Sequence, residues 1–203
     1  MTRRLLVGAA LLALPLASSH AQVPAMPAVS VFAGAGGAFA LSQPQFDRST
    51  GTAAVAGLEV APFSGATGFV QRLAIRLEGG FTKQEFAHRS SVLGGDVQTV
   101  HAALALQAPL VQAGGLFTYA LAGGAWARPS TRITLNATGS TTPGAAFEQT
   151  SHETVPGALL GVGAGWRYGA ASLRAEVRWL SLATTQKATS MLPALVTVSF
   201  PVR

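Results

Sequence analysis

The chain has 203 residues, of which 49% are hydrophobic and only 11% are charged. Soluble domains carry about 25% charged residues, so something other than water must cover much of this surface. The absence of cysteine excludes disulfide frameworks and thiolate metal sites. The formal net charge is +6, but the basic residues form no cluster that could follow phosphates, and we expect no nucleic-acid partner.

Residues 1–21 have the pattern of a cleaved signal peptide. Two arginines precede the uncharged run Leu5–Ala17, and small residues occupy the positions one and three before the expected cleavage point after Ala21. A membrane anchor would need about 20 apolar residues, whereas this run is shorter and contains Pro15. The pattern therefore predicts export, with cleavage of the first 21 residues.

A short proline-containing lead-in over residues 22–28 is followed by segments in which apolar residues alternate with polar or small ones. An alternation with a period of two is that of a β-strand. In Phe69–Lys83 the odd positions are mostly large and apolar, while the even positions include Arg72, Arg76 and Glu78. The first four predicted strands are residues 29–41, 52–61, 69–83 and 96–108, and residues 84–95 are predicted as a polar loop.

The fifth predicted strand, residues 116–127, has Phe117, Tyr119 and Leu121 on its apolar face. This parity points Trp126 inward unless a bulge at Gly123-Gly124 shifts the register. Residues 129–152 are rich in Thr, Ser, Gly and Pro and are predicted as a long loop, which in proteins is usually functional or mobile.

The last third of the chain has the clearest register. Gly169-Ala170 suits a two-residue hairpin turn between strands at residues 155–168 and 171–182. In that hairpin, glycines of the first strand lie opposite charged residues of the second. The predicted pairs are Gly165 with Arg174, Gly163 with Glu176, and Gly161 with Arg178. A final strand is predicted at residues 191–203.

These eight strands are joined by alternating long and short connections, which is typical of outer-membrane barrels with long external loops and short periplasmic turns. Residues 29–203 are therefore predicted to form an all-β fold, a single closed eight-stranded antiparallel transmembrane β-barrel with up-and-down order. Aromatic residues should form one band at each lipid interface. The periplasmic band would contain Phe63, Phe69, Phe117, Trp166, Tyr168 and Phe200, and the external band Phe39, Phe81 and Trp179.

The charged face should line the barrel interior. Around a ring of eight, the third and seventh strands stand opposite each other, and they carry Arg72, Arg76 and Glu78 on one side and Arg174, Glu176 and Arg178 on the other. An eight-stranded barrel has room inside only for side chains. We expect a filled, ion-paired lumen in which large charged groups mesh with glycines and other small residues.

The signal sequence, the eight strands, the aromatic bands and the final segment Val196-Thr197-Val198-Ser199-Phe200 resemble the small outer-membrane β-barrels of the OmpA/OmpX and opacity-protein type. The resemblance implies the outer membrane of a Gram-negative bacterium and insertion by the outer-membrane assembly machinery, which reads an aromatic residue near the C-terminus. This chain departs from relatives in that Pro201-Val202-Arg203 follow the aromatic residue. The expected partners are outer-membrane lipid and the assembly machinery, and the expected state is a monomer.

No catalytic, cofactor-binding or metal-binding residue is assigned. His88 and Ser90 have the spacing of the pair used by lipid A deacylase barrels, with Glu85 as the nearest acid, but they fall in a predicted loop. We interpret them as part of a solvated loop. His101 should face the lumen as a hydrogen-bonding partner, since no second histidine has ligand spacing.

The sequence predicts a structural or surface-interaction protein of the outer membrane that acts through its external loops and is not an enzyme. The alternative is a narrow porin-like channel for small solutes. A lipid-modifying esterase that uses His88 and Ser90 is a third reading. A soluble lipocalin-like barrel with the apolar face inward is a fourth, and it conflicts with the charges that share one face.

Overall fold

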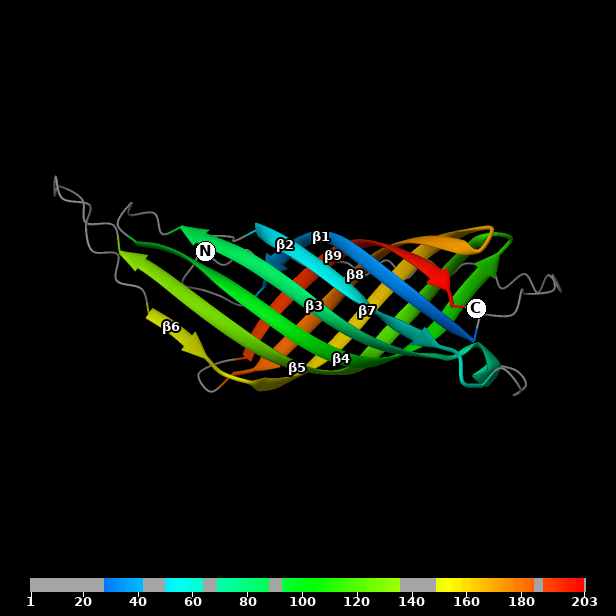
Figure 1. The fold of residues 1–203 in the computed structure, drawn as a ribbon, viewed down its shortest axis with the longest axis horizontal. Coiled ribbons are helices and arrows are strands. Elements are labelled where there is room, and N and C mark those ends of the chain that lie inside the picture. Colours follow the sequence, from blue (N-terminus) through cyan, green and yellow to red (C-terminus); the bar gives the residue numbers. More distant parts are fainter. Residues whose placement is uncertain are drawn as a thin grey trace, which may run out of the picture.

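The computed structural model describes residues 28–41, 50–63, 69–87, 93–135, 149–184 and 188–202. These ranges contain nine β-strands and one short 3-10 helix (Figure 1). No helix within them has the length and hydrophobicity needed to cross a membrane. The strands are β1 (Val29–Ala40), β2 (Thr50–Val60), β3 (Ala74–Ala87), β4 (Leu93–Ala113), β5 (Leu116–Leu135), β6 (Gln149–His152), β7 (Val155–Tyr168), β8 (Ala171–Ala183) and β9 (Ala188–Pro201).

The strands form one closed antiparallel sheet. β1 pairs with both β2 and β9, and the pairing of β4 with β5 completes the ring. β7 pairs with β5 along residues 116–127, and β6 pairs with β5 along residues 130–133, so β6 and β7 together occupy one position. The described part of the chain is therefore an eight-stranded up-and-down barrel, which confirms the predicted strand number, closure and strand order.

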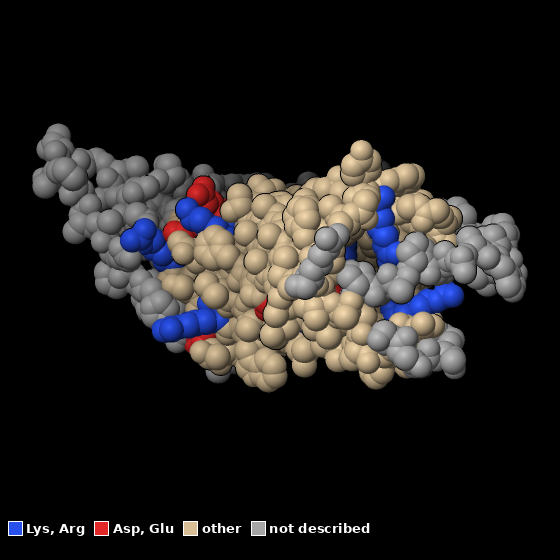
Figure 2. Space-filling view, turned by 45° about the vertical axis from the view of Figure 1, so that its right-hand side comes forward, with Lys and Arg blue, Asp and Glu red and all other residues tan. Residues whose placement is uncertain are grey.

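The two faces of the sheet differ in the way that the alternation predicts. Leu77, Val177 and Val196 point outward and are exposed, whereas Arg76, Glu176 and their inward neighbours are buried. Figure 2 shows the result on one side of the molecule, where charged side chains lie mostly towards the two ends and a largely uncharged band lies between them. An apolar belt around a polar interior is the arrangement of a barrel that sits in lipid.

The two ends of the barrel also differ. At the turn end lie the connections 61–73, 114–115 and 169–170, together with the start of β1 and the end of β9 (Figure 1). The other end, called the loop end here, contains the remaining connections. The turns at the turn end use Gly114 and Gly169, each with a φ of 59°, which glycine adopts without strain. The predicted β7–β8 hairpin is confirmed, including all three glycine–charge pairs.

The third strand begins later than the alternation predicts. Val70–Arg72 forms the 3-10 helix, because the amides of Arg72 and Leu73 donate to the carbonyls of Phe69 and Val70. β3 therefore starts at Ala74, and Arg72 is exposed outside the strand and does not line the lumen. The connection from β2 is correspondingly longer than the predicted turn, so long connections are not confined to one end.

Strands also continue into both predicted loops at the loop end. β3 runs to Ala87 and β4 begins at Leu93, so most of residues 84–95 is paired strand. β5 continues to Leu135 and β6 pairs with it, so the predicted loop 129–152 is a hairpin whose residues 136–148 lie outside the described residues. The outward positions of these segments include Lys83, Glu85, Asp96, Gln98, Arg128 and Arg132, so the outer apolar period that marks the other strands is missing here.

The facing predicted for the fifth strand is wrong. Phe117, Tyr119 and Leu121 point into the barrel, and Trp126 points outward with 63% of its surface exposed. No bulge interrupts the pairing at Gly123-Gly124. Trp126 lies about ten residues from the turn end of β5, close to the length of strand that crosses a bilayer, so it belongs to the aromatic band at the loop end, and Phe117 does not belong to the band at the turn end.

The apolar belt ends at nearby register positions on three neighbouring strands, where Phe81 pairs with Val100 and Ala102 pairs with Trp126. Its boundary falls between Phe81 and Lys83 on β3, between Val100 and Gln98 on β4, and between Trp126 and Arg128 on β5. β4 and β5, joined by β6, continue past this level, and Figure 1 shows them extending beyond the other strands. We call residues 83–87, 93–98, 128–135 and 149–152 the loop-end extension.

The facing of the strands predicts the effect of an added charge on the outer surface. Leu77→Arg places a cation in the apolar belt and should lower the free energy of unfolding in bilayers by about 2–4 kcal/mol. Gln98→Arg is the matched control, because it adds the same side chain beyond the boundary, and it should leave the stability nearly unchanged. Urea titration of both variants in lipid vesicles measures the difference, and equal stability of the two would contradict the assigned facing.

Candidate functional site: the filled barrel interior

Four charged side chains form a closed cluster in the middle of the barrel. β3 contributes Arg76 and Glu78, and β8, which stands opposite in the ring, contributes Glu176 and Arg178. Arg76 Nη1 lies 2.9 Å from Glu176 Oε1, and Arg178 Nη1 lies 2.6 Å from Glu78 Oε1. Arg76 Nε approaches Glu78 Oε2 at 3.0 Å, and Arg178 also pairs with Glu176. Positive and negative groups alternate around the cluster, so its net charge is zero.

Neutral side chains complete this central cluster. The Tyr119 hydroxyl donates to Glu176 Oε1 at 2.6 Å, and the Thr197 hydroxyl donates to the same oxygen at 3.2 Å. The Arg76 guanidinium lies 3.7 Å from the centroid of the Phe32 ring, which is close enough for a cation–π interaction. Each charged group therefore has partners, which buried charges require.

A second cluster lies nearer the turn end. Arg174 Nη1 donates to Glu59 Oε2 at 2.6 Å, and Arg174 Nε donates to the Ser172 hydroxyl at 3.1 Å. Gln107 Nε2 donates to Glu59 Oε1 at 3.0 Å. The Tyr119 ring lies between the two clusters in reach of both, since its centroid is 5.7 Å from the Arg174 guanidinium.

Glycines of β7 make the room that the inward aromatic rings need. A Cβ atom on Gly163 would lie 2.4 Å from the Tyr119 ring, and one on Gly165 would lie 2.6 Å from the Phe117 ring. The predicted fit of glycines against large inward groups is thus correct, with aromatic side chains as well as charges filling the space. Phe32, Phe117 and Tyr119 were not predicted as lumen residues, although these glycines pointed to bulky groups opposite them.

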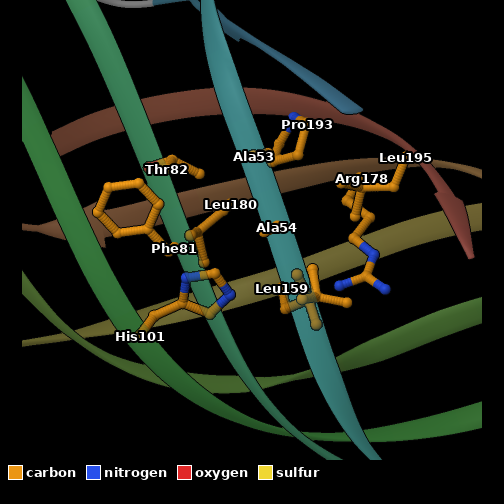
Figure 3. Close-up of a pocket in the computed structure, with 11 residues that line it drawn as sticks. Ala53, Ala54, Phe81, Thr82, His101, Leu159, Arg178, Leu180, Pro193 and Leu195 are labelled. Carbon is orange, nitrogen blue, oxygen red and sulfur yellow. The ribbon is translucent and has the colours of Figure 1, made fainter. Parts of the chain in front are cut away.

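The half of the interior towards the loop end is mainly apolar. Its buried residues include Ala38, Ala53, Val55, Ala103, Ala105, Ala125, Ala127, Val155, Leu159, Leu180, Leu182, Met191 and Leu195. Figure 3 shows a cavity in this region, with the His101 ring near Leu159 and Leu180. The cavity measures about 10 Å³, close to the least space that one water molecule requires.

His101 lines that cavity from β4, facing the lumen as predicted, with Thr82 and Arg178 among the other lining residues. Its Nδ1 atom has no hydrogen-bond partner among the described residues. Within the described ranges, no three His, Asp or Glu residues are placed to hold a metal ion. His88 and Ser90 lie outside the described residues, and Glu85 pairs with Lys83 at 3.2 Å on the exposed surface.

Paired charges and apolar side chains occupy the described interior along its length. Ions entering from the turn end would meet two paired clusters, and those entering from the loop end would meet the apolar packing around Leu159 and Met191. The arrangement stabilises a closed barrel. The fold and interior together define a small eight-stranded β-barrel of the outer-membrane type.

Two solved structures share this fold over nearly the whole of their own length. Neisserial surface protein A has a TM-score of 0.56 at 13% identity, over 86% of this chain and 97% of that one. A major outer-membrane protein of Thermus thermophilus has a TM-score of 0.50 at 16% identity, over 85% and 97%. Ail of Yersinia pestis has a TM-score of 0.49 at 9% identity, over 86% and 99%. No protein-family model matches the chain, and neither does any curated protein.

Removing one member of the central cluster should leave its partners without a counter-charge. Glu176→Gln keeps the shape of the side chain but leaves two buried arginines facing a single glutamate, so we expect a loss of about 3–5 kcal/mol in unfolding free energy. Glu85→Gln is the control, because the Glu85 side chain is 75% exposed and its ion pair contributes little. Similar stabilities of the two variants in vesicles would show that the central cluster does not stabilise the barrel.

The glycine positions make a separate prediction. Gly163→Ala would push a methyl group against the Tyr119 ring and should cost about 1–3 kcal/mol. Gly124→Ala tests the same chemical change where the nearest atom is a carbonyl oxygen 3.9 Å away, and it should be tolerated. Equilibrium unfolding of both variants measures the contrast, which would vanish if Tyr119 did not face the lumen.

Proposed function

We propose that the chain is an integral protein of the outer membrane of a Gram-negative bacterium, with a closed lumen, that acts at the cell surface through its loop-end extension. Residues 1–21 are its signal peptide, residues 22–28 a short lead-in, and residues 29–203 the barrel. The observation that carries the proposal is the contrast between an interior filled by paired charges and apolar groups and an extension that continues in regular strands beyond the apolar belt.

The loop-end extension has the composition of a surface exposed to water. Its outward side chains include Lys83 and Glu85 on β3, Asp96 on β4, and Arg128 and Arg132 on β5. Positive and negative side chains are both present, and Lys83 pairs with Glu85. Such a mixed surface is suited to specific contacts with a partner and not to general attraction of oppositely charged molecules. The name of Neisserial surface protein A places that protein at a surface, which agrees with this role.

The alternative function, a narrow channel, requires water to pass the clusters around Glu176 and Glu59 and the apolar packing beyond them. Charges that are already paired and hydrogen-bonded do not need to be solvated, and an apolar constriction tends to exclude water. The cavity beside His101 is too small for a hydrated ion. The interior therefore supports a closed barrel over a pore.

Planar-bilayer recording tests the closed lumen. The wild-type barrel should produce no stable conductance step, whereas a variant with Leu159, Leu180 and Met191 replaced by serine should conduct more readily, because water can enter a polar interior. The matched control replaces outward Leu77 with serine and should remain silent. Reproducible conductance steps from the wild-type barrel would instead support the channel.

The orientation can be tested because the chain contains no cysteine. Ser130→Cys lies in the loop-end extension and Ala170→Cys lies in the turn between β7 and β8. On intact cells, a membrane-impermeant maleimide should label Cys at position 130 and spare position 170 until the outer membrane is broken. Labelling only at position 170 would place the extension in the periplasm and rule out the surface role, and failure to find the chain in the outer-membrane fraction would rule out the location.

A further inference from the structure

The turn-end mouth of the barrel carries a positive charge that no described acidic residue balances. The inward-facing glutamates are Glu59, Glu78 and Glu176, and each already pairs with Arg76, Arg174 or Arg178. Arg167 on β7 is a fourth inward arginine, half-buried, and within the described part of the chain no carboxylate lies at ion-pair distance from it. The inner face of the described strands therefore carries four arginines and three glutamates.

Two guanidinium groups share one aromatic ring at this mouth. The Arg167 guanidinium lies 5.2 Å from the centroid of the Phe117 ring, and that of Arg174 lies 5.6 Å from the same centroid. The ring holds both cations in place through its face. Glu59 already forms an ion pair with Arg174, in which Glu59 Oε2 lies 2.6 Å from Arg174 Nη1. Two cations therefore lie beside one ring, and Glu59 pairs with only one of them, so an additional anion would stabilise this mouth.

Hydroxyl groups extend this donor set. Ser172 lies opposite Arg167 in the β7–β8 register, and Ser199 lies opposite Ser172 in the β8–β9 register. Both serines are buried on the inner face. The Ser172 oxygen accepts a hydrogen bond from Arg174, which leaves its own O–H free to donate. Guanidinium and hydroxyl donors gathered in one place match the oxygens of a phosphate or a carboxylate.

Access to this mouth is from one side. Arg167 lies two residues before Gly169, at the turn end. Further in, the bond between Tyr119 and Glu176 and the central cluster close the way. A ligand would enter from the turn end and stop beside Arg167.

We infer that the turn-end mouth is an oxyanion-binding site, in which Arg167 provides the charge and Ser172 and Ser199 provide hydroxyl donors. The ligand is a phosphate or carboxylate group, either free in the compartment that the turn end faces or part of an anionic lipid headgroup. This inference concerns the end of the barrel opposite the loop-end extension, so it does not depend on the proposed surface role.

The test measures thermal unfolding of the barrel chain, residues 22–203, folded in an uncharged detergent. Replacing chloride by inorganic phosphate at equal ionic strength and pH should raise the midpoint of the wild type by about 2 °C or more. Arg167→Gln should abolish this rise. Arg128→Gln removes an exposed arginine at the other end of the barrel and should retain it.

A comparison within each protein separates a binding site from a merely structural arginine. Arg167→Gln removes both the repulsion with Arg174 and the contact with the Phe117 ring, so the midpoint of each protein in phosphate is compared with that of the same protein in chloride. An equal phosphate effect in the wild type and in Arg167→Gln would overturn the inference, since the effect would then be general to the salt.

The two sources of the oxyanion are distinguished in vesicles. If a lipid headgroup is the ligand, adding phosphatidylglycerol to phosphatidylcholine vesicles should raise the midpoint of the wild type, but not of Arg167→Gln, without free phosphate. If a free oxyanion is the ligand, the rise should require inorganic phosphate in both kinds of vesicle. No rise in either arm for the wild type would refute the site.

Discussion

The structure depends on the limited space inside a ring of eight strands, which admits side chains but little water. Any charge that points inward must then find a partner inside. Arg76 and Glu78 reach across the barrel to Glu176 and Arg178, and Tyr119 donates to the same glutamate. Because these contacts join opposite walls, they constrain the register and facing of distant strands together. A shift of one strand by one residue would turn its charged side chains outward. An apolar side chain would then face the remaining charge in the lumen and leave it unpaired.

The interior is divided along its length, and the division follows from the order of residues on each strand. From the turn end, the inward positions of β8 are Ser172, Arg174, Glu176 and Arg178, followed by Leu180 and Leu182. The polar half gives the barrel a specific internal pairing, while the apolar half closes it by packing. This division leaves the mouth at the turn end as the polar surface of the lumen open to solvent, and the strands beyond the apolar belt as the surface at the other end.

Much of this fold could be predicted from the sequence because the outer and inner faces have opposite chemistry along most strands. The β7–β8 register followed from one turn, Gly169-Ala170, and the opposing charges of β3 and β8 followed from ring order. The fifth strand could not be oriented in this way, because large apolar or aromatic residues occur on both of its faces. The loop-end extension was missed for a related reason: its outward side chains are polar, so its strands lack the apolar period that marks the belt. The internal contacts of Tyr119 required the folded structure.

The most direct test of this account is the facing of Trp126, because it reports whether β5 turns Tyr119 towards Glu176. With Trp166 and Trp179 replaced by phenylalanine, the barrel would contain Trp126 as its single tryptophan. Its fluorescence should be strongly quenched by brominated lipids in the bilayer, since the side chain points outward at the edge of the apolar belt. Fluorescence that is insensitive to brominated lipid would place Trp126 in the lumen, turn β5 over, and contradict the ion-paired interior described above.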